Sequence, residues 1–308
     1  MALGAFLDGI RRVAASWRLL LVLLLAASGP ALFVALATGS PAHEVGTAGA
    51  GAAGTAGGFV GTAHTIGLDA SDFAVVAAFS SLAEGRPRVG AAGLALAGMA
   101  VWTFLAGGAL DRLARQRWMG SAGFLAACRH HFWPLARLAV LAGAMYWLLL
   151  GVIDSWLFSG PPGASARDPA SGAGADAFRF VLHGLFVAGR AGIGLLVDYA
   201  RVRAVVEDRR SMIGALVAAL RFVARRPAAV AGLWLLNMVL LALLLAGCSL
   251  VASFAMDVGR SGPFLVGQVY AAAHLFATLV AWGSQTAYFQ VQLAHPTYVA
   301  RARVPRTG

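Results

Sequence analysis

The sequence of 308 residues is poor in charge and in cysteine, and it contains no lysine. Charged residues make up 12% of the chain, against about 25% in an average soluble domain. Two cysteines exclude a disulfide-stabilised scaffold, and a hydrophobic fraction of 59% excludes a disordered chain. The mean hydropathy of +0.76 therefore predicts a protein that is largely surrounded by lipid.

A helix needs about 20 residues to cross a bilayer. Six apolar stretches of the sequence are close to this length or longer. They cover residues 19–37, 90–110, 135–158, 177–197, 228–254 and 263–289. A transmembrane β-barrel would instead show segments of about 10 residues with alternating polarity. We therefore expect an all-α polytopic membrane protein with six transmembrane helices, forming a single integral membrane domain over residues 1–308.

All 24 basic residues are arginines, and 18 of them fall on one side of the expected spans. This side comprises both ends of the chain and the loops between spans 2 and 3 and between spans 4 and 5. Because arginine-rich loops remain in the cytoplasm, we expect both termini to be cytoplasmic, in a cell (inner) membrane. The outer loops, residues 39–67 and 159–176, are rich in small residues and turn formers and are expected to be flexible.

The net charge of +11 favours membrane lipids, chiefly anionic ones, as partners. Binding to nucleic acid would need a water-exposed basic module with stacking aromatic residues, and the sequence offers none. Protein partners and a homo-oligomer are further expectations. No cofactor and no metal ion are expected.

Three cytoplasmic segments have apolar residues at helical spacing with arginines on other faces: residues 3–17, 121–132 and 213–223. This pattern predicts basic amphipathic helices at the membrane interface. Connecting helices packed on the bundle would give the same pattern. Five arginines in and around the third segment are expected to bind anionic lipids: Arg209, Arg210, Arg221, Arg225 and Arg226.

Residues 198–236 read DYARVRAVVEDRRSMIGALVAALRFVARRPAAVAGLWLL. This arginine cluster, amphipathic helix and Arg-Arg-Pro entry into a span resembles bacterial six-span membrane families of unassigned function. It is distantly similar in style to the membrane domain attached to some glycerophosphodiester phosphodiesterases. The resemblance implies a helical membrane fold but no activity, because the sequence has no counterpart of the catalytic phosphodiesterase barrel.

Polar side chains inside a membrane are costly unless they are paired or face water, so they are the best candidates for a site. The candidates are Arg190, His183, Asp154, Asn237 and His274. In one interpretation they form a polar pathway in which Arg190 binds an anion. In the other they are structural, and Arg190 caps carbonyls or extends toward the interface.

Asp111 and Asp198 lie where two spans end at the cytoplasmic side. Arg115 and Arg201 follow them at four and three residues, within helical reach, so we expect two structural ion pairs. His130 and His131 follow Arg129 directly, and this trio is interpreted as a solvated patch at the interface.

Two functions from different classes follow. The first is a non-enzymatic component that organises the membrane or binds partners through its arginine-rich face. The alternative is a permease for small solutes or lipids that uses the intramembrane arginine and histidine cluster. An enzyme is not expected, because the sequence offers no nucleophile motif, metal motif or paired acids at one membrane depth.

Overall fold

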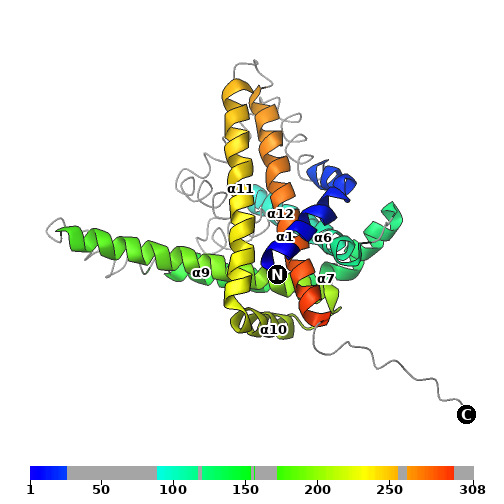
Figure 1. Cartoon of the computed structure of the whole chain (residues 1–308), viewed down its shortest axis with the longest axis horizontal. Coiled ribbons are helices and arrows are strands. Elements are labelled where there is room, and N and C mark those ends of the chain that lie inside the picture. Colours follow the sequence, from blue (N-terminus) through cyan, green and yellow to red (C-terminus); the bar gives the residue numbers. More distant parts are fainter. Residues whose placement is uncertain (26–88, 117–119, 154–155, 157–171, 256–261, 295–308) are drawn as a thin grey trace, which may run out of the picture. The chain divides into compact units, whose positions relative to one another are not determined.

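The computed structural model describes residues 1–25, 89–116, 120–153, 156, 172–255 and 262–294 (Figure 1). Apart from short turns, these residues are helical, and no strand occurs among them. The expected all-α fold is confirmed for this part of the chain. The expected outer loop 39–67 lies outside the described residues, whereas the last five residues of the other, from Gly172 on, already belong to a helix.

The described chain forms seven α-helices of 13 to 35 residues and one π-helical segment, and residues 17–25 are also helical. In chain order the elements are α1 (Ala2–Ala14), α6 (Val89–Arg115), α7 (Ser121–Trp147), η1 (Leu148–Ile153), α9 (Gly172–Val206), α10 (Met212–Arg225), α11 (Pro227–Ala255) and α12 (Gly262–Ala294).

Three helical stretches of the described residues are long and apolar enough to cross a membrane: Ser121–Ile153, Phe180–Val206 and Pro227–Val251. They contain or overlap the expected spans 135–158, 177–197 and 228–254. Of the other expected spans, 90–110 and 263–289 lie within α6 and α12, and 19–37 is described only to residue 25. The total of six spans stays a prediction.

Proline has different effects at two expected junctions between an amphipathic helix and a span. α7 continues through Pro134 and then into η1, so the expected interfacial helix 121–132 and the following span form one helix. Leu135, Leu138 and Ala142 are buried just beyond the proline, and their packing offsets the missing N–H. At the second junction α10 ends at Arg225, and Pro227 begins α11, where no N–H is needed.

The chain divides into two compact units. The first comprises Met1–Gly54, Ala109–Phe124 and Val223–Gly308, and the second comprises Thr55–Gly108 and Leu125–Phe222. Among the described residues, the first unit contains α1, the end of α6, α11 and α12. The second contains the rest of α6, most of α7, α9 and most of α10.

In the first unit, α12 packs against both α1 and α11, and α11 and α12 lie side by side (Figure 1). Glycines allow α1 and α12 to touch at the backbone. A Cβ atom at Gly9 would lie 2.6 Å from the backbone nitrogen of Ser284, and one at Gly283 would lie 3.3 Å from the Cα of Gly9. The buried face of α1 is accordingly narrow, and its residues, Ala5, Gly9 and Val13, have short side chains. α1 is therefore packed on protein along this face.

Arg12 and Gln290 cap the C-terminal end of α6, whose last carbonyls have no donors within the helix. Nη1 of Arg12 donates to the Leu113 carbonyl and to Oε1 of Gln290, each at 3.0 Å. Nε2 of Gln290 donates to the Ala114 carbonyl at 2.8 Å. Asp8 lies 2.8 Å from Nη2 of Arg12 and orients the guanidinium. The negative end of the α6 dipole thus meets a fixed cation.

We expect Gly9→Ala to lower the free energy of unfolding by about 1–3 kcal/mol, because the new methyl group would overlap the backbone of α12. Gly4→Ala is the matched control in the same helix, since a Cβ at Gly4 meets nothing within 4 Å. Thermal and denaturant unfolding of the detergent-solubilised protein measure the effect. Equal stability of the two variants would contradict the close packing at Gly9.

Candidate functional site

The five residues expected to form an intramembrane polar site are divided between the two units. Arg190 and His183 belong to α9 in the second unit, whereas Asn237 and His274 belong to α11 and α12 in the first. Asp154 lies outside the described residues. A single polar pathway through all five therefore stays a prediction.

Asn237 links α11 to α12. Its side-chain amide is buried and donates to the Leu233 carbonyl at 2.8 Å and to Oγ of Ser284 at 3.2 Å. The Ser284 hydroxyl in turn donates to the Ala281 carbonyl at 3.0 Å. Hydrogen bonds of this kind join neighbouring helices in membranes. Asn237 therefore has a structural role in the first unit.

Arg190 and His183 differ in burial although seven residues separate them on one helix. Arg190 is 4% exposed, whereas His183 is exposed. The start of α9 exposes large apolar side chains such as Phe180 and Leu185, and the helix becomes covered toward Val197. Burial along α9 thus depends on distance from its N-terminus as well as on the face of the helix. Arg190 lies where the covered part begins.

The two ion pairs expected at the ends of spans are confirmed. Nε of Arg115 lies 2.6 Å from Oδ1 of Asp111, and Nη1 of Arg201 lies 3.3 Å from Oδ1 of Asp198. The Asp111 side chain is almost fully buried, so its charge needs this partner. Both pairs join residues within one helical turn, which is why their spacing was sufficient to predict them.

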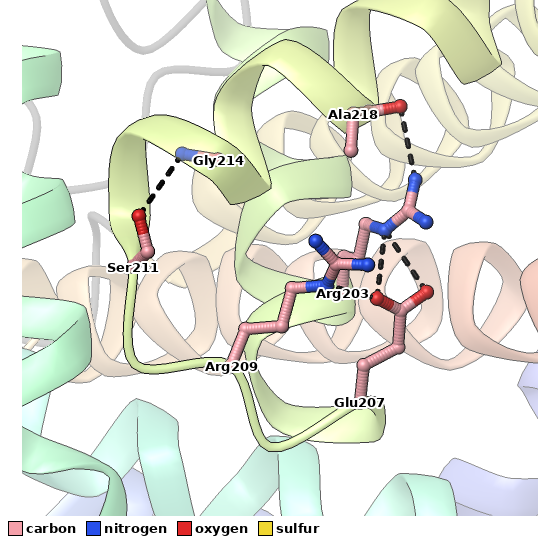
Figure 2. Close-up of polar contacts among 6 residues, drawn as sticks. All are labelled: Arg203, Glu207, Arg209, Ser211, Gly214 and Ala218. Atoms are coloured by element: carbon pink, nitrogen blue, oxygen red, sulfur yellow. Dashed lines mark hydrogen bonds and ion pairs between the residues drawn. The ribbon is translucent and has the colours of Figure 1, made fainter.

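Arginines also organise the turn between α9 and α10 (Figure 2). Glu207 accepts from Nε of Arg203, with N–O distances of 2.9 and 3.0 Å, and it also pairs with Arg209. Nη1 of Arg203 donates to the Ala218 carbonyl at 3.0 Å, which ties α10 to the end of α9. Arg209, expected to bind lipid, therefore has a carboxylate partner within the protein.

Ser211 caps the N-terminus of α10. Its Oγ accepts from the backbone N–H of Gly214 at 3.4 Å (Figure 2). Neither Ser211 nor Glu207 was predicted from the sequence to have a structural role. A serine just before an amphipathic run is a helix-start signal that could have located the cap.

α10 buries mostly small residues and exposes large apolar ones. Met212, Ala215 and Ala219 are buried. Ile213, Val217 and Leu220, which lie within a sector of about 60° on the helix, are 67%, 42% and 54% exposed. A water-facing helix places large apolar side chains inward, so this arrangement is suited to a lipid environment.

The expected lipid-binding arginines surround this apolar sector unequally. Arg210, Arg221 and Arg225 are exposed, and Arg226 is half-buried. Arg221 and Arg225 are four residues apart on α10 and border the apolar sector. We call Ile213, Val217, Leu220, Arg221 and Arg225 the α10 face.

A second basic feature is a cavity of about 400 Å³ in the first unit, lined in part by Asp8, Arg11, Arg12, Ser16 and Arg112. Arg12 is held by Asp8, and Nε of Arg112 donates to Oγ of Ser16 at 3.3 Å. Arg11 is exposed. The cavity has more positive than negative charge, but two of its three arginines already bond within the protein.

Arg129, His130 and His131 do not form the uniformly solvated patch that we expected, because His131 is only 3% exposed. His130 is exposed, and its Nε2 lies 3.0 Å from Oδ1 of Asp208 in the α9–α10 turn. Hydrogen bonding to His130 is the main cause that holds the pKa of Asp208 below its usual value. Asp208 has a φ of 50°, a left-handed conformation that Asp tolerates well.

Comparison of the chain with models of known protein families, with curated proteins and with solved structures found no match. The similarity to six-span membrane families thus stays a prediction.

A double-mutant cycle tests the structural role of Asn237. We expect Asn237→Ala and Ser284→Ala to couple by about 0.5–1.5 kcal/mol in the free energy of unfolding, because each removes one partner of the same buried hydrogen bond. Ser249→Ala on α11 is the control, since its hydroxyl bonds only to the Ala246 carbonyl of its own helix among the contacts described. Coupling of Asn237 to Ser249 as strong as to Ser284 would contradict this assignment.

Proposed function

We propose that the protein is a non-enzymatic component of the cell (inner) membrane that binds anionic lipid headgroups through the α10 face. The single observation that carries the proposal is the exposure of large apolar side chains beside the exposed arginines Arg221 and Arg225 on α10. In this arrangement Ile213, Val217 and Leu220 enter the acyl boundary while Arg221 and Arg225 meet phosphate groups.

The proposal includes six spans with cytoplasmic termini, because that topology puts α10 on the cytoplasmic leaflet. This leaflet carries the anionic lipids that attract arginine. The helices on either side of α10 support the placement. Phe180–Val206 and Pro227–Val251 are both apolar enough to span a bilayer, so the short connection between them lies near a membrane surface.

The energetics favour lipid over water for this surface. Burying a large apolar side chain contributes about 1.5–3 kcal/mol, so the three exposed residues contribute several kcal/mol on entering lipid. Each arginine near an anionic surface adds about 1 kcal/mol, an effect that salt screens. The apolar residues thus set the depth of α10, and the arginines select the lipid.

We expect phosphatidylglycerol to raise the melting temperature of the detergent-solubilised protein more than phosphatidylcholine does. In Arg221→Gln/Arg225→Gln the affinity for phosphatidylglycerol should fall by about 30-fold, since two arginines contribute about 2 kcal/mol. Lipid titration by thermal shift, and lipid retention in native mass spectrometry, measure the effect.

Two control variants sharpen this experiment. Arg221→Lys/Arg225→Lys keeps the charge and should retain most of the preference for phosphatidylglycerol. Arg11→Gln/Arg18→Gln removes two exposed charges from a different part of the chain and should leave it nearly unchanged. An equal loss in both glutamine variants would mean that total charge, and not the α10 face, determines binding.

The burial of Arg190 favours a second candidate function, that of a permease for small anions. A buried arginine within a candidate span is costly and is typical of substrate pathways. If this function holds, a soluble anion such as phosphate stabilises the wild type, Arg190→Ala abolishes the stabilisation and Arg210→Ala does not. Stabilisation by lipids alone, unchanged in Arg190→Ala, favours the first function.

A further inference from the structure

We propose that His130, His131 and Asp208 bind a divalent transition-metal cation, with Zn²⁺ the best match, and that the cation joins α7 to the α9–α10 turn. The three residues lie in one unit, and one ligand atom from each lies within 4.8 Å of the others. This site is separate from the α10 face, so the proposal does not depend on the proposed function.

The chemistry of the ligands selects the class of metal. Two imidazoles and one carboxylate suit Zn²⁺ and related cations, whereas Mg²⁺ and Ca²⁺ prefer oxygen ligands. Zn²⁺ commonly takes three protein ligands and leaves a fourth position for water. The side chains of His130 and Asp208 are 58% and 68% exposed, so that position has access to solvent.

The geometry requires only small adjustments. Ligand atoms of a tetrahedral zinc site lie about 3.4 Å apart, given metal–ligand distances of about 2.0–2.2 Å. The separation of 3.0 Å between Nε2 of His130 and Oδ1 of Asp208 is already close to this value. The centroids of the two imidazole rings are 4.8 Å apart, and the rings meet edge to face. The buried His131 gives a fixed ligand, and the two exposed side chains can rotate toward it.

The site lies at an end of α7 that the bilayer need not cover. The helical stretch Ser121–Ile153 has 33 residues, and about 20 are enough to span. His130 and His131 fall in its first third, and Asp208 follows the end of Phe180–Val206. A cation from the aqueous phase can therefore reach His130 and Asp208, which are exposed, and the buried His131 lies beside them.

A nearby positive charge makes the proposal testable in both directions. Arg210 is exposed and lies only two residues from Asp208 in the same turn, so its positive charge opposes a bound cation. Arg210→Gln should therefore tighten metal binding, whereas loss of a ligand should weaken it.

The experiment uses the full-length protein in detergent, freed of metal with a chelator and titrated with ZnCl₂ by isothermal titration calorimetry. We expect one equivalent of Zn²⁺ to bind, with affinity about 100-fold weaker in His130→Gln and in Asp208→Asn. Both altered side chains are exposed, and circular dichroism checks that the variants are folded. Co²⁺ in place of Zn²⁺ should give visible absorption bands that the same two variants lose.

His183→Gln is the matched control, because His183 is an exposed histidine of the same unit that is not part of the cluster. It should bind Zn²⁺ as the wild type does. The proposal is overturned if the wild type takes up no stoichiometric Zn²⁺, if Mg²⁺ binds equally well, or if His183→Gln weakens binding as much as His130→Gln does.

Discussion

The guanidinium of Arg12 determines how the first unit is held together. It contacts Asp8 on its own helix, the Leu113 carbonyl at the end of α6, and Gln290 on α12. Gly9, three residues earlier, lets the backbones of α1 and α12 touch, which brings Gln290 of α12 within reach of Arg12. Close packing and capping are therefore coupled. In a low-dielectric environment, carbonyls at a helix end need such donors.

α1 and α10 show how packing in this chain differs from packing in a soluble protein. Both bury a narrow face of mostly small residues, and both expose leucine, isoleucine or valine. In water such a helix would turn its large apolar residues inward. Small inward residues allow helices to approach closely, and large outward residues are suited to lipid. The same sequence feature thus accounts for the helix contacts and supports the lipid binding that we propose for α10.

Features that depend on neighbours along the chain were predictable from sequence. Within the residues that the structure describes, the apolar runs are helical, and the Asp111–Arg115 and Asp198–Arg201 pairs form because one helical turn brings their side chains together. Contacts between distant segments were not predictable, since nothing in the local pattern connects Gly9 with Ser284. The burial of His131 was missed because burial depends on tertiary packing. An interfacial helix 121–132 and a span from residue 135 were expected as separate segments, but α7 continues through Pro134, with buried residues on both sides of the proline.

The π-helical segment η1 changes the phase of the helix that precedes it. An α-helix bonds each N–H to the carbonyl four residues back, and a π-helix bonds it to the fifth. The wider π turn therefore puts the side chains of Leu148–Ile153 out of phase with those of Ser121–Trp147, compared with an uninterrupted α-helix. Leu148–Ile153 therefore shifts the register at the end of the helical stretch Ser121–Ile153. A helical wheel that assumes a continuous α-helix assigns these last side chains to the wrong face. Loss of one residue within this stretch would restore the α-helical phase without disturbing the helix that precedes it.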